Sequence, residues 1–210
     1  RYRFHEGDGF INPVDVTVDR RGRLFVSDSE AGVVVVLDAD GDEIGRIRDG
    51  LIRPTGVVAH PTSGEIFIVD TQAHQVVVFD ETVAPFSEGG RVSRRFGTRG
   101  SGPGELNYPT LIAAGPAGDV YVSDALNFRI QVFSSEGEYR RSFGELGDAV
   151  GEFARPKGLS VDEQGRVFVV EGLYDVVNVF DADGRLLMTF GGAGRADGNF
   201  WLATGLALDV

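Results

Sequence analysis

A frame of twelve residues recurs four times in this chain without a gap, and no other feature constrains the fold as strongly. The copy within Val120–Phe133 predicts two short β-strands joined by a polar turn that begins at Asp124, because β-branched and aromatic residues alternate on both sides. The frame also occupies three other ranges: Val26–Leu37, Ile68–Phe79 and Val169–Phe180. A carboxylate stands at the third position of every copy: Asp28, Asp70, Asp124 and Glu171. Four copies of one hairpin predict a repeat architecture.

Two further strands flank each hairpin. A strand that begins at proline precedes every copy: Pro13–Asp19, Pro54–His60, Pro109–Gly115 and Pro156–Asp162. A closing strand follows every copy: Ile44–Ile47, Val92–Phe96, Tyr139–Phe143 and Leu186–Phe190. Four strands in repeats of about 40–50 residues are typical of a β-propeller. We therefore predict an all-β fold, a β-propeller of four-stranded antiparallel blades, with four full blades plus partial strands at both ends.

The motifs within each unit resemble the NHL-repeat family, whose propellers are of the six-bladed type. The third and fourth units carry its elements most clearly, in Pro156–Asp162, Gly118–Asp124 and Asn127–Phe133. Asp124, Asn127 and Arg129 match the family's D-x-x-N-x-R element, and the resemblance implies that they hydrogen-bond between neighbouring turns. The other copies have different residues at the Asn and Arg positions: Ala31 and Val33, Ala73 and Gln75, Tyr174 and Val176.

The four units do not close a ring by themselves. Residues 1–4 align with a fourth strand and residues 203–209 with a first strand, so at least one hairpin is missing between them. We expect residues 1–210 to be a single NHL-like domain that belongs to a larger ring. The resemblance also implies a bacterial, extracytoplasmic protein, either periplasmic or secreted, because such propellers are often found there.

Net charge and hydropathy limit the classes of partner that this chain can have. A net charge of −12 opposes binding to phosphate backbones, so we expect no nucleic-acid partner. The longest aliphatic run, Val33–Leu37, is too short to span a bilayer, so we expect no direct membrane insertion.

The acids, histidines and glycines are the candidates for catalysis and metal binding. The four turn carboxylates could ring a cation, or each could cap its own turn, and we favour capping because all four units repeat it. The histidines, His5, His60 and His74, show no zinc-ligand spacing. The glycine-rich stretch 97–104 lacks the G-K-[ST] ending of a phosphate loop. We therefore expect no catalytic residue, no metal site and no cofactor.

The binding surface is predicted where the repeats differ. After their shared carboxylate, the turns between second and third strands read SEAG, TQAH, ALNF and GLYD. Five residues on this side, conventionally the top face, are the candidates for binding a protein partner or a small ligand: Asp15, His74, Phe128, Lys157 and Tyr174. Phe128 and Tyr174 are expected to be exposed aromatic anchors. Pro85 and Phe86, in the longer insertion 80–90, are expected to form a secondary contact.

The leading functional hypothesis is a non-enzymatic propeller that acts as a protein-interaction or ligand-binding module. A separate hypothesis is a purely structural subunit of a larger complex, which the incomplete ring supports. The alternative is a lyase- or lactonase-like enzyme with a metal on the propeller axis, as the resemblance allows. That enzyme would need a cluster of inward-pointing ligands, of which only Asp15 is a candidate.

Overall fold

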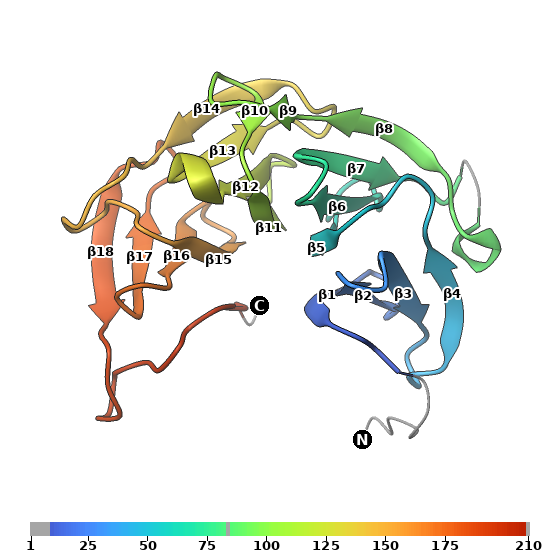
Figure 1. The fold of residues 1–210 in the computed structure, drawn as a ribbon, viewed down its shortest axis with the longest axis horizontal. Helices are drawn as coiled ribbons and strands as arrows, with labels where there is room; N and C mark the ends of the chain where they lie inside the picture. Colours follow the sequence, from blue (N-terminus) through green and yellow to red (C-terminus); the bar gives the residue numbers. More distant parts are fainter. Residues whose placement is uncertain (1–8, 83–84, 209–210) are drawn as a thin grey trace. The chain divides into compact units, whose positions relative to one another are not determined.

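The structure, a computed structural model, describes residues 9–82 and 85–208. The chain divides into two compact units, residues 1–98 and residues 99–210. Each unit contains two four-stranded sheets in which consecutive strands are neighbours (Figure 1). The prediction of an all-β fold built from four-stranded antiparallel blades is therefore confirmed. The partial strand expected at residues 203–209 is not formed over residues 203–208, and the one expected at residues 1–4 lies outside the described residues.

The first unit holds blades one and two. Blade one consists of β1 (Pro13–Val18), β2 (Leu24–Asp28), β3 (Val33–Leu37) and β4 (Glu43–Ile47). Blade two consists of β5 (Pro54–Ala59), β6 (Ile66–Asp70), β7 (Gln75–Phe79) and β8 (Val92–Phe96), with the 3-10 helix η1 (Phe86–Glu88) before β8.

The second unit holds blades three and four. The short strands β9 (Thr98–Arg99) and β10 (Glu105–Leu106) lie in the link that leads to blade three. Blade three consists of β11 (Pro109–Ala114), β12 (Val120–Asp124), β13 (Arg129–Phe133) and β14 (Tyr139–Phe143), with the 3-10 helix η2 (Ala125–Asn127) between β12 and β13. Blade four consists of β15 (Pro156–Val161), β16 (Val167–Glu171), β17 (Val176–Phe180) and β18 (Leu186–Gly191).

The register explains why each first strand starts at proline. In all four blades the proline pairs with the carboxylate residue that ends the second strand, as in Pro109↔Asp124 and Pro156↔Glu171. An irregularity in the register follows each of these prolines. Proline is tolerated there because the missing N–H is at the first residue of a strand and next to a bulge.

The core of the first unit lies between its two blades and includes the insertion that was expected to make an external contact. Phe86 is only 2% exposed, and its ring meets the ring of Phe25 edge-on at 5.4 Å between centroids. A Cβ atom at Gly45 would clash with the backbone of Phe86, so glycine lets β4 approach η1. The expectation that Phe86 forms a secondary binding contact was wrong, because the insertion folds back and buries this ring.

The core of the second unit joins blade three to blade four through aromatic residues. The ring of Phe180 lies 5.0 Å from that of Phe143 and 5.7 Å from that of Phe153, measured between centroids. Phe153 stands in the link ahead of β15 and is fully buried. Within the described residues, neither 3-10 helix nor any other helix is long and apolar enough to cross a membrane.

Candidate functional site

Each blade brings the turn after its second strand together with the link that precedes its first strand. One backbone hydrogen bond joins the two segments in every blade: Ser29 N to Asn12 O, Thr71 N to Arg53 O, Leu126 N to Asn107 O and Gly172 N to Arg155 O, at 3.0–3.1 Å. These bonds place turn and link at the same end of the blade. We call this end the link–turn face, and the hairpin turns at the other end of the strands the opposite face.

The four turn carboxylates hold these segments together. Asp28 accepts hydrogen bonds from the amides of Ile11 and Asn12 at 2.6 and 3.0 Å, and Glu171 accepts from the amides of Ala154 and Arg155. Asp70 accepts in the same way from the amides of Ile52 and Arg53. All four carboxylates are buried. Three of them also accept from an amide of their own turn, as the capping interpretation predicted: Asp28 from Ala31, Asp70 from Ala73 and Glu171 from Leu173. The bonds to the link amides were not predicted, and they hold the link to the turn.

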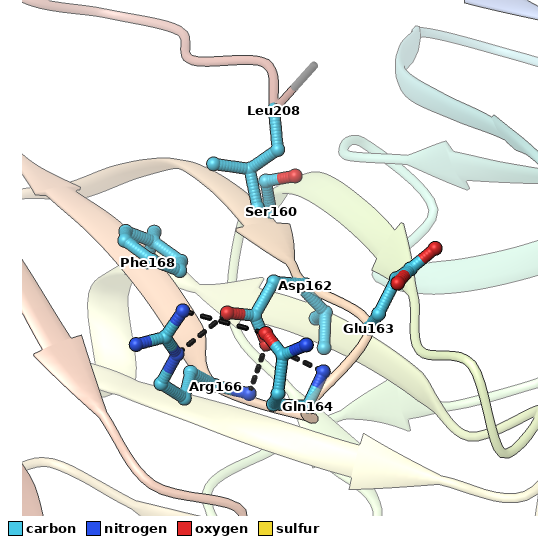
Figure 2. Close-up of a pocket in the computed structure, with 8 residues that line it drawn as sticks. Ser160, Asp162, Glu163, Gln164, Arg166, Phe168 and Leu208 are labelled. Carbon is cyan, nitrogen blue, oxygen red and sulfur yellow. Dashed lines mark hydrogen bonds and ion pairs between the residues drawn. The ribbon is translucent and has the colours of Figure 1, made fainter. Parts of the chain in front are cut away.

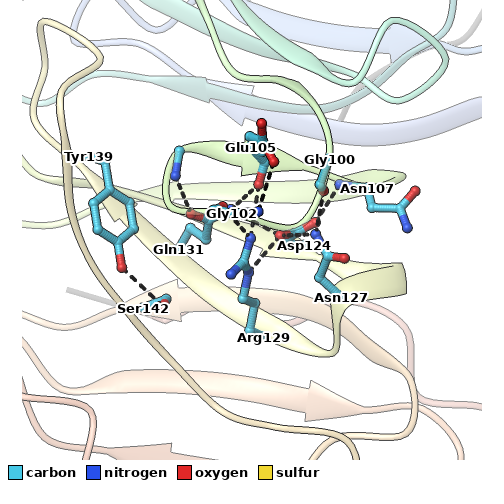
Figure 3. A network of polar contacts seen from close by, with 11 residues as sticks. Gly100, Gly102, Glu105, Asn107, Asp124, Asn127, Arg129, Gln131, Tyr139 and Ser142 are labelled. Atoms are coloured by element: carbon cyan, nitrogen blue, oxygen red, sulfur yellow. Dashed lines mark hydrogen bonds and ion pairs between the residues drawn. The ribbon is translucent and has the colours of Figure 1, made fainter.

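Asp124 has the largest set of donors (Figure 3). It accepts from the Asn107 amide at 2.6 Å, from Asn127 Nδ2 and Arg129 Nε at 2.8 Å each, and from Gln131 Nε2 at 2.9 Å. Three link carbonyls, those of Gly100, Gly102 and Glu105, accept from Asn127 and Arg129 in turn. The NHL-like element thus fixes the turn to the glycine-rich link ahead of its own blade.

Sequence reasoning missed Gln131 as a member of this network. A signal was available, because the equivalent position is Val35 in blade one and Val77 in blade two. A fully buried glutamine at a valine position needs hydrogen-bond partners, and Gln131 finds them in Asp124 and in the carbonyl oxygen of Glu105.

The five predicted binding residues are divided between the two units. Asp15 and His74 lie in the first unit, whereas Phe128, Lys157 and Tyr174 lie in the second. The structure buries His74, which stands in the turn of blade two. Phe128 differs from the expected exposed aromatic, because it is half-buried against the core of its unit. Tyr174 is exposed over 40% of its surface.

Asp15 occupies a position in β1 where β5 and β15 have glycine, and its side chain joins blade one to blade two. Its Oδ2 atom accepts a hydrogen bond of 2.9 Å from the amide of Val57, and Oδ1 accepts one of 2.9 Å from the amide of Val16. Burial raises the pKa of this carboxyl to about 6, although both amide hydrogen bonds act to lower it. The carboxyl thus serves as a bond between two blades.

Lys157, the second residue of β15, lies against the turn of its own blade. A Cβ atom at Gly172 would be 2.7 Å from both Cδ and Cε of the lysine, so the stem of Lys157 crosses this glycine. The backbone carbonyl of Lys157 accepts a hydrogen bond of 2.7 Å from Ser123 Oγ of blade three.

Large hydrophobic side chains are exposed in the links and turns at the link–turn face of the second unit. Trp201 is 64% exposed and Leu126 is 51% exposed. The complete set of eight comes from three links and two turns: Tyr108, Leu126, Leu146, Val150, Leu173, Tyr174, Trp201 and Leu202. Sequence reasoning found only Tyr174 among them, although Leu126 and Leu173 lie in the variable turns that it singled out.

The opposite face of the second unit has a different character. Its hairpin turns, residues 115–119, 134–138, 162–166 and 181–185, contain no exposed large hydrophobic residue in the described chain. A hollow of about 390 Å³ lies beside one of them, lined by Ser160, Asp162, Arg166 and Phe168 among others (Figure 2). Asp162 accepts hydrogen bonds there from Arg166 Nε at 2.6 Å and from two backbone amides.

These bonds outweigh the effect of burial and lower the pKa of Asp162, so that its carboxylate stays charged and caps the turn. In the described part of the chain, no three His, Cys, Asp or Glu side chains are placed to hold a metal ion together.

Comparison with known proteins agrees with this architecture. The NHL-repeat family model matches residues 106–133, which contain Asp124, Asn127 and Arg129. The chain is a β-propeller that carries an NHL repeat. No curated protein matches the sequence.

Several solved structures share the fold of this propeller. Virginiamycin B lyase from Staphylococcus aureus is 14% identical, with a TM-score of 0.65 over 89% of this chain. A gluconolactonase from Xanthomonas campestris is 21% identical, with a TM-score of 0.63 over 92% of this chain. Hydrazine synthase from Kuenenia stuttgartiensis is 18% identical, with a TM-score of 0.65 over 89% of this chain.

This propeller spans 57% of the length of the lyase, 64% of the gluconolactonase and 52% of the hydrazine synthase chain. At these identities the likeness concerns the fold.

Proposed function

We propose that this propeller is a non-enzymatic interaction module that binds a protein partner through the link–turn face of residues 99–210. The observation that carries the proposal is the presence of eight exposed large hydrophobic side chains in the links and turns of that face, while the turns of the opposite face have none among the described residues. Contiguous exposed apolar patches bordered by polar residues are characteristic of interaction sites.

The composition of the face supports a protein partner. Tyr108, Tyr174 and Trp201 are of the residue types that most often dominate binding energy in protein interfaces. The set extends over links and turns of both blades, whereas small-molecule sites are usually concave cavities that enclose most of their ligand.

The backbone beneath the face is well fixed. Asp124 and Glu171 tie both turns to their links, so the exposed side chains project from a rigid scaffold. A preorganised surface loses little conformational entropy on binding, which favours affinity.

The alternative of an enzyme with an axial metal has less support from the geometry. It depends on Asp15, and both oxygens of that carboxylate accept hydrogen bonds from backbone amides. An interaction module requires only the exposed face, which the chain presents without rearrangement.

The proposal can be tested with two matched substitutions. Leu126→Asp removes an exposed leucine from the link–turn face, and Leu187→Asp removes one from the outer strand β18, where the side chain is 54% exposed. Both variants and the unmodified protein are immobilised and incubated with extract of the cells that produce the protein, and captured proteins are quantified by mass spectrometry.

A partner that is retained by Leu187→Asp and lost by Leu126→Asp supports the proposal. A partner that is retained by Leu126→Asp and lost by Leu187→Asp places the binding surface on the outer strand and contradicts it.

A further inference from the structure

In blades two and four the second residue of the first strand touches the first residue of the turn. In blade two this pair is Thr55 and Thr71, whose hydroxyl oxygens are 2.7 Å apart. In blade four the pair is Lys157 and Gly172, and the glycine leaves room for the lysine stem. The long side chain therefore follows the turn that carries Leu173 and Tyr174.

The ammonium group of Lys157 has no carboxylate partner within residues 9–82 and 85–208. Among the described residues, neither Lys157 nor the exposed Arg155 forms an ion pair. The adjacent carboxylate of Glu171 is 1% exposed and accepts hydrogen bonds from the amides of Ala154, Arg155 and Leu173. An ammonium group has three N–H donors and no acceptor, so Lys157 retains donors for a ligand.

Two cations that form no ion pair with a described residue are notable in a chain with a net charge of −12. Exposed acids of the preceding link, Glu145 and Asp148, form no ion pair with either cation in the described structure. Leu173 and Tyr174 supply exposed apolar surface next to the lysine. Complementary charge placed beside an apolar anchor fixes the register and specificity of a partner.

We infer that Lys157, with Arg155, binds a carboxylate of the partner polypeptide, whose neighbouring apolar side chains cover Leu173 and Tyr174. The inference rests on the proposed interaction function and specifies the chemistry of the partner, an acidic segment with apolar residues beside the acid. The carboxylate comes from an Asp or Glu side chain or from the end of the partner chain.

The test starts from a phage-displayed library of random twelve-residue peptides selected on the immobilised protein. The best peptide that requires Tyr174 is synthesised, labelled and titrated by fluorescence anisotropy. It is titrated against the unmodified protein and against Lys157→Ala, Lys157→Arg and Leu187→Asp. Peptides in which Glu or Asp is replaced by the amide, or whose C-terminus is amidated, form the second arm.

The inference predicts selected peptides rich in Asp or Glu beside Leu, Phe, Tyr or Trp. Lys157→Ala weakens their binding about tenfold or more, while Lys157→Arg and Leu187→Asp preserve it. The neutral peptide binds the unmodified protein as weakly as the acidic peptide binds Lys157→Ala. Loss on C-terminal amidation alone identifies a terminal carboxylate, and loss on side-chain replacement identifies Asp or Glu.

Peptides that require Tyr174 but show no acidic enrichment, or that bind Lys157→Ala unchanged, overturn the inference and leave the proposed function standing. If the selected peptides bind equally well when Tyr174, Leu126 or Leu173 is replaced, both the inference and the proposed function are overturned. Thermal melting of each variant, with Lys157→Arg as the conservative reference, shows that losses in binding do not come from unfolding.

Discussion

The hydroxyl of Ser123 donates a hydrogen bond of 2.7 Å to the backbone carbonyl of Lys157. It joins the end of β12 in blade three to the start of β15 in blade four, directly beneath the link–turn face. The same bond occurs between blades one and two, where Ser27 Oγ donates to the carbonyl of Thr55. A fully buried serine therefore links neighbouring blades within each unit and holds Lys157 in place.

We expect Ser123→Val to destabilise the protein by about 1–2 kcal/mol, because the partly buried carbonyl of Lys157 loses its donor. Valine fits the blade, since Val69 and Val170 stand at the equivalent positions. The measurement is the midpoint of urea denaturation, with Ser101→Ala, an exposed serine of the link, as the control. An unchanged midpoint for Ser123→Val would show that the interblade bond adds no stability.

Asp124→Ala should be the most destabilising of the turn substitutions. It leaves Arg129, Asn127, Gln131 and the Asn107 amide without their shared acceptor, and removing one partner of a buried ion pair typically costs about 3–5 kcal/mol. Asp28→Ala removes an acceptor of backbone amides only and should cost about 1–3 kcal/mol.

Chemical denaturation of both variants gives the comparison, and the exposed Asp148→Ala serves as the neutral reference. If Asp124→Ala and Asp28→Ala lower the free energy of unfolding equally, the side-chain network around Asp124 adds no stability beyond the carboxylate–amide bonds that all blades share.

Asp15 should give the protein an unusual dependence on pH. Burial raises the pKa of its carboxyl from 3.8 to about 6 in the folded state. The folded protein then holds this proton more tightly than the unfolded chain does. Protonated Asp15 therefore makes its full contribution to the free energy of unfolding below about pH 4. This contribution is lost as the pH rises toward and through about 6.

Asp15→Asn cannot ionise, and the melting temperature of this variant should not fall between pH 4 and pH 6.5 as that of the unmodified protein does. Glu65 and Glu81 provide an internal control, because hydrogen bonds from Arg94 and Arg23 lower the pKa of these carboxyls. Their stabilisation is lost below about pH 4 in both proteins. Parallel melting curves over the whole pH range would contradict the role assigned to Asp15.

Most of the fold could be predicted from the sequence because its signals are local and repeated. In every blade a proline begins the first strand and a carboxylate residue ends the second strand. The register pairs these two positions directly, as in Pro109↔Asp124. Phe86 could not be placed in this way, since its insertion occurs once and its burial depends on contact with Phe25.

The candidate site was predicted less completely, because most of its features occur once and depend on contacts between segments. Tyr174 could be found because it stands in a turn that differs between repeats. Exposure of Trp201 and burial of His74 depend on how links and turns pack together, which no periodic pattern records.

The most direct test of the central claim is site-specific photo-cross-linking in the cells that produce the protein. A photoreactive phenylalanine analogue replaces Tyr174 on the link–turn face or Glu163, an exposed residue of an opposite-face turn. We predict a cross-linked protein partner from position 174, abolished by Leu126→Asp, and none from position 163. A partner that cross-links from position 163 and not from position 174 would contradict the account.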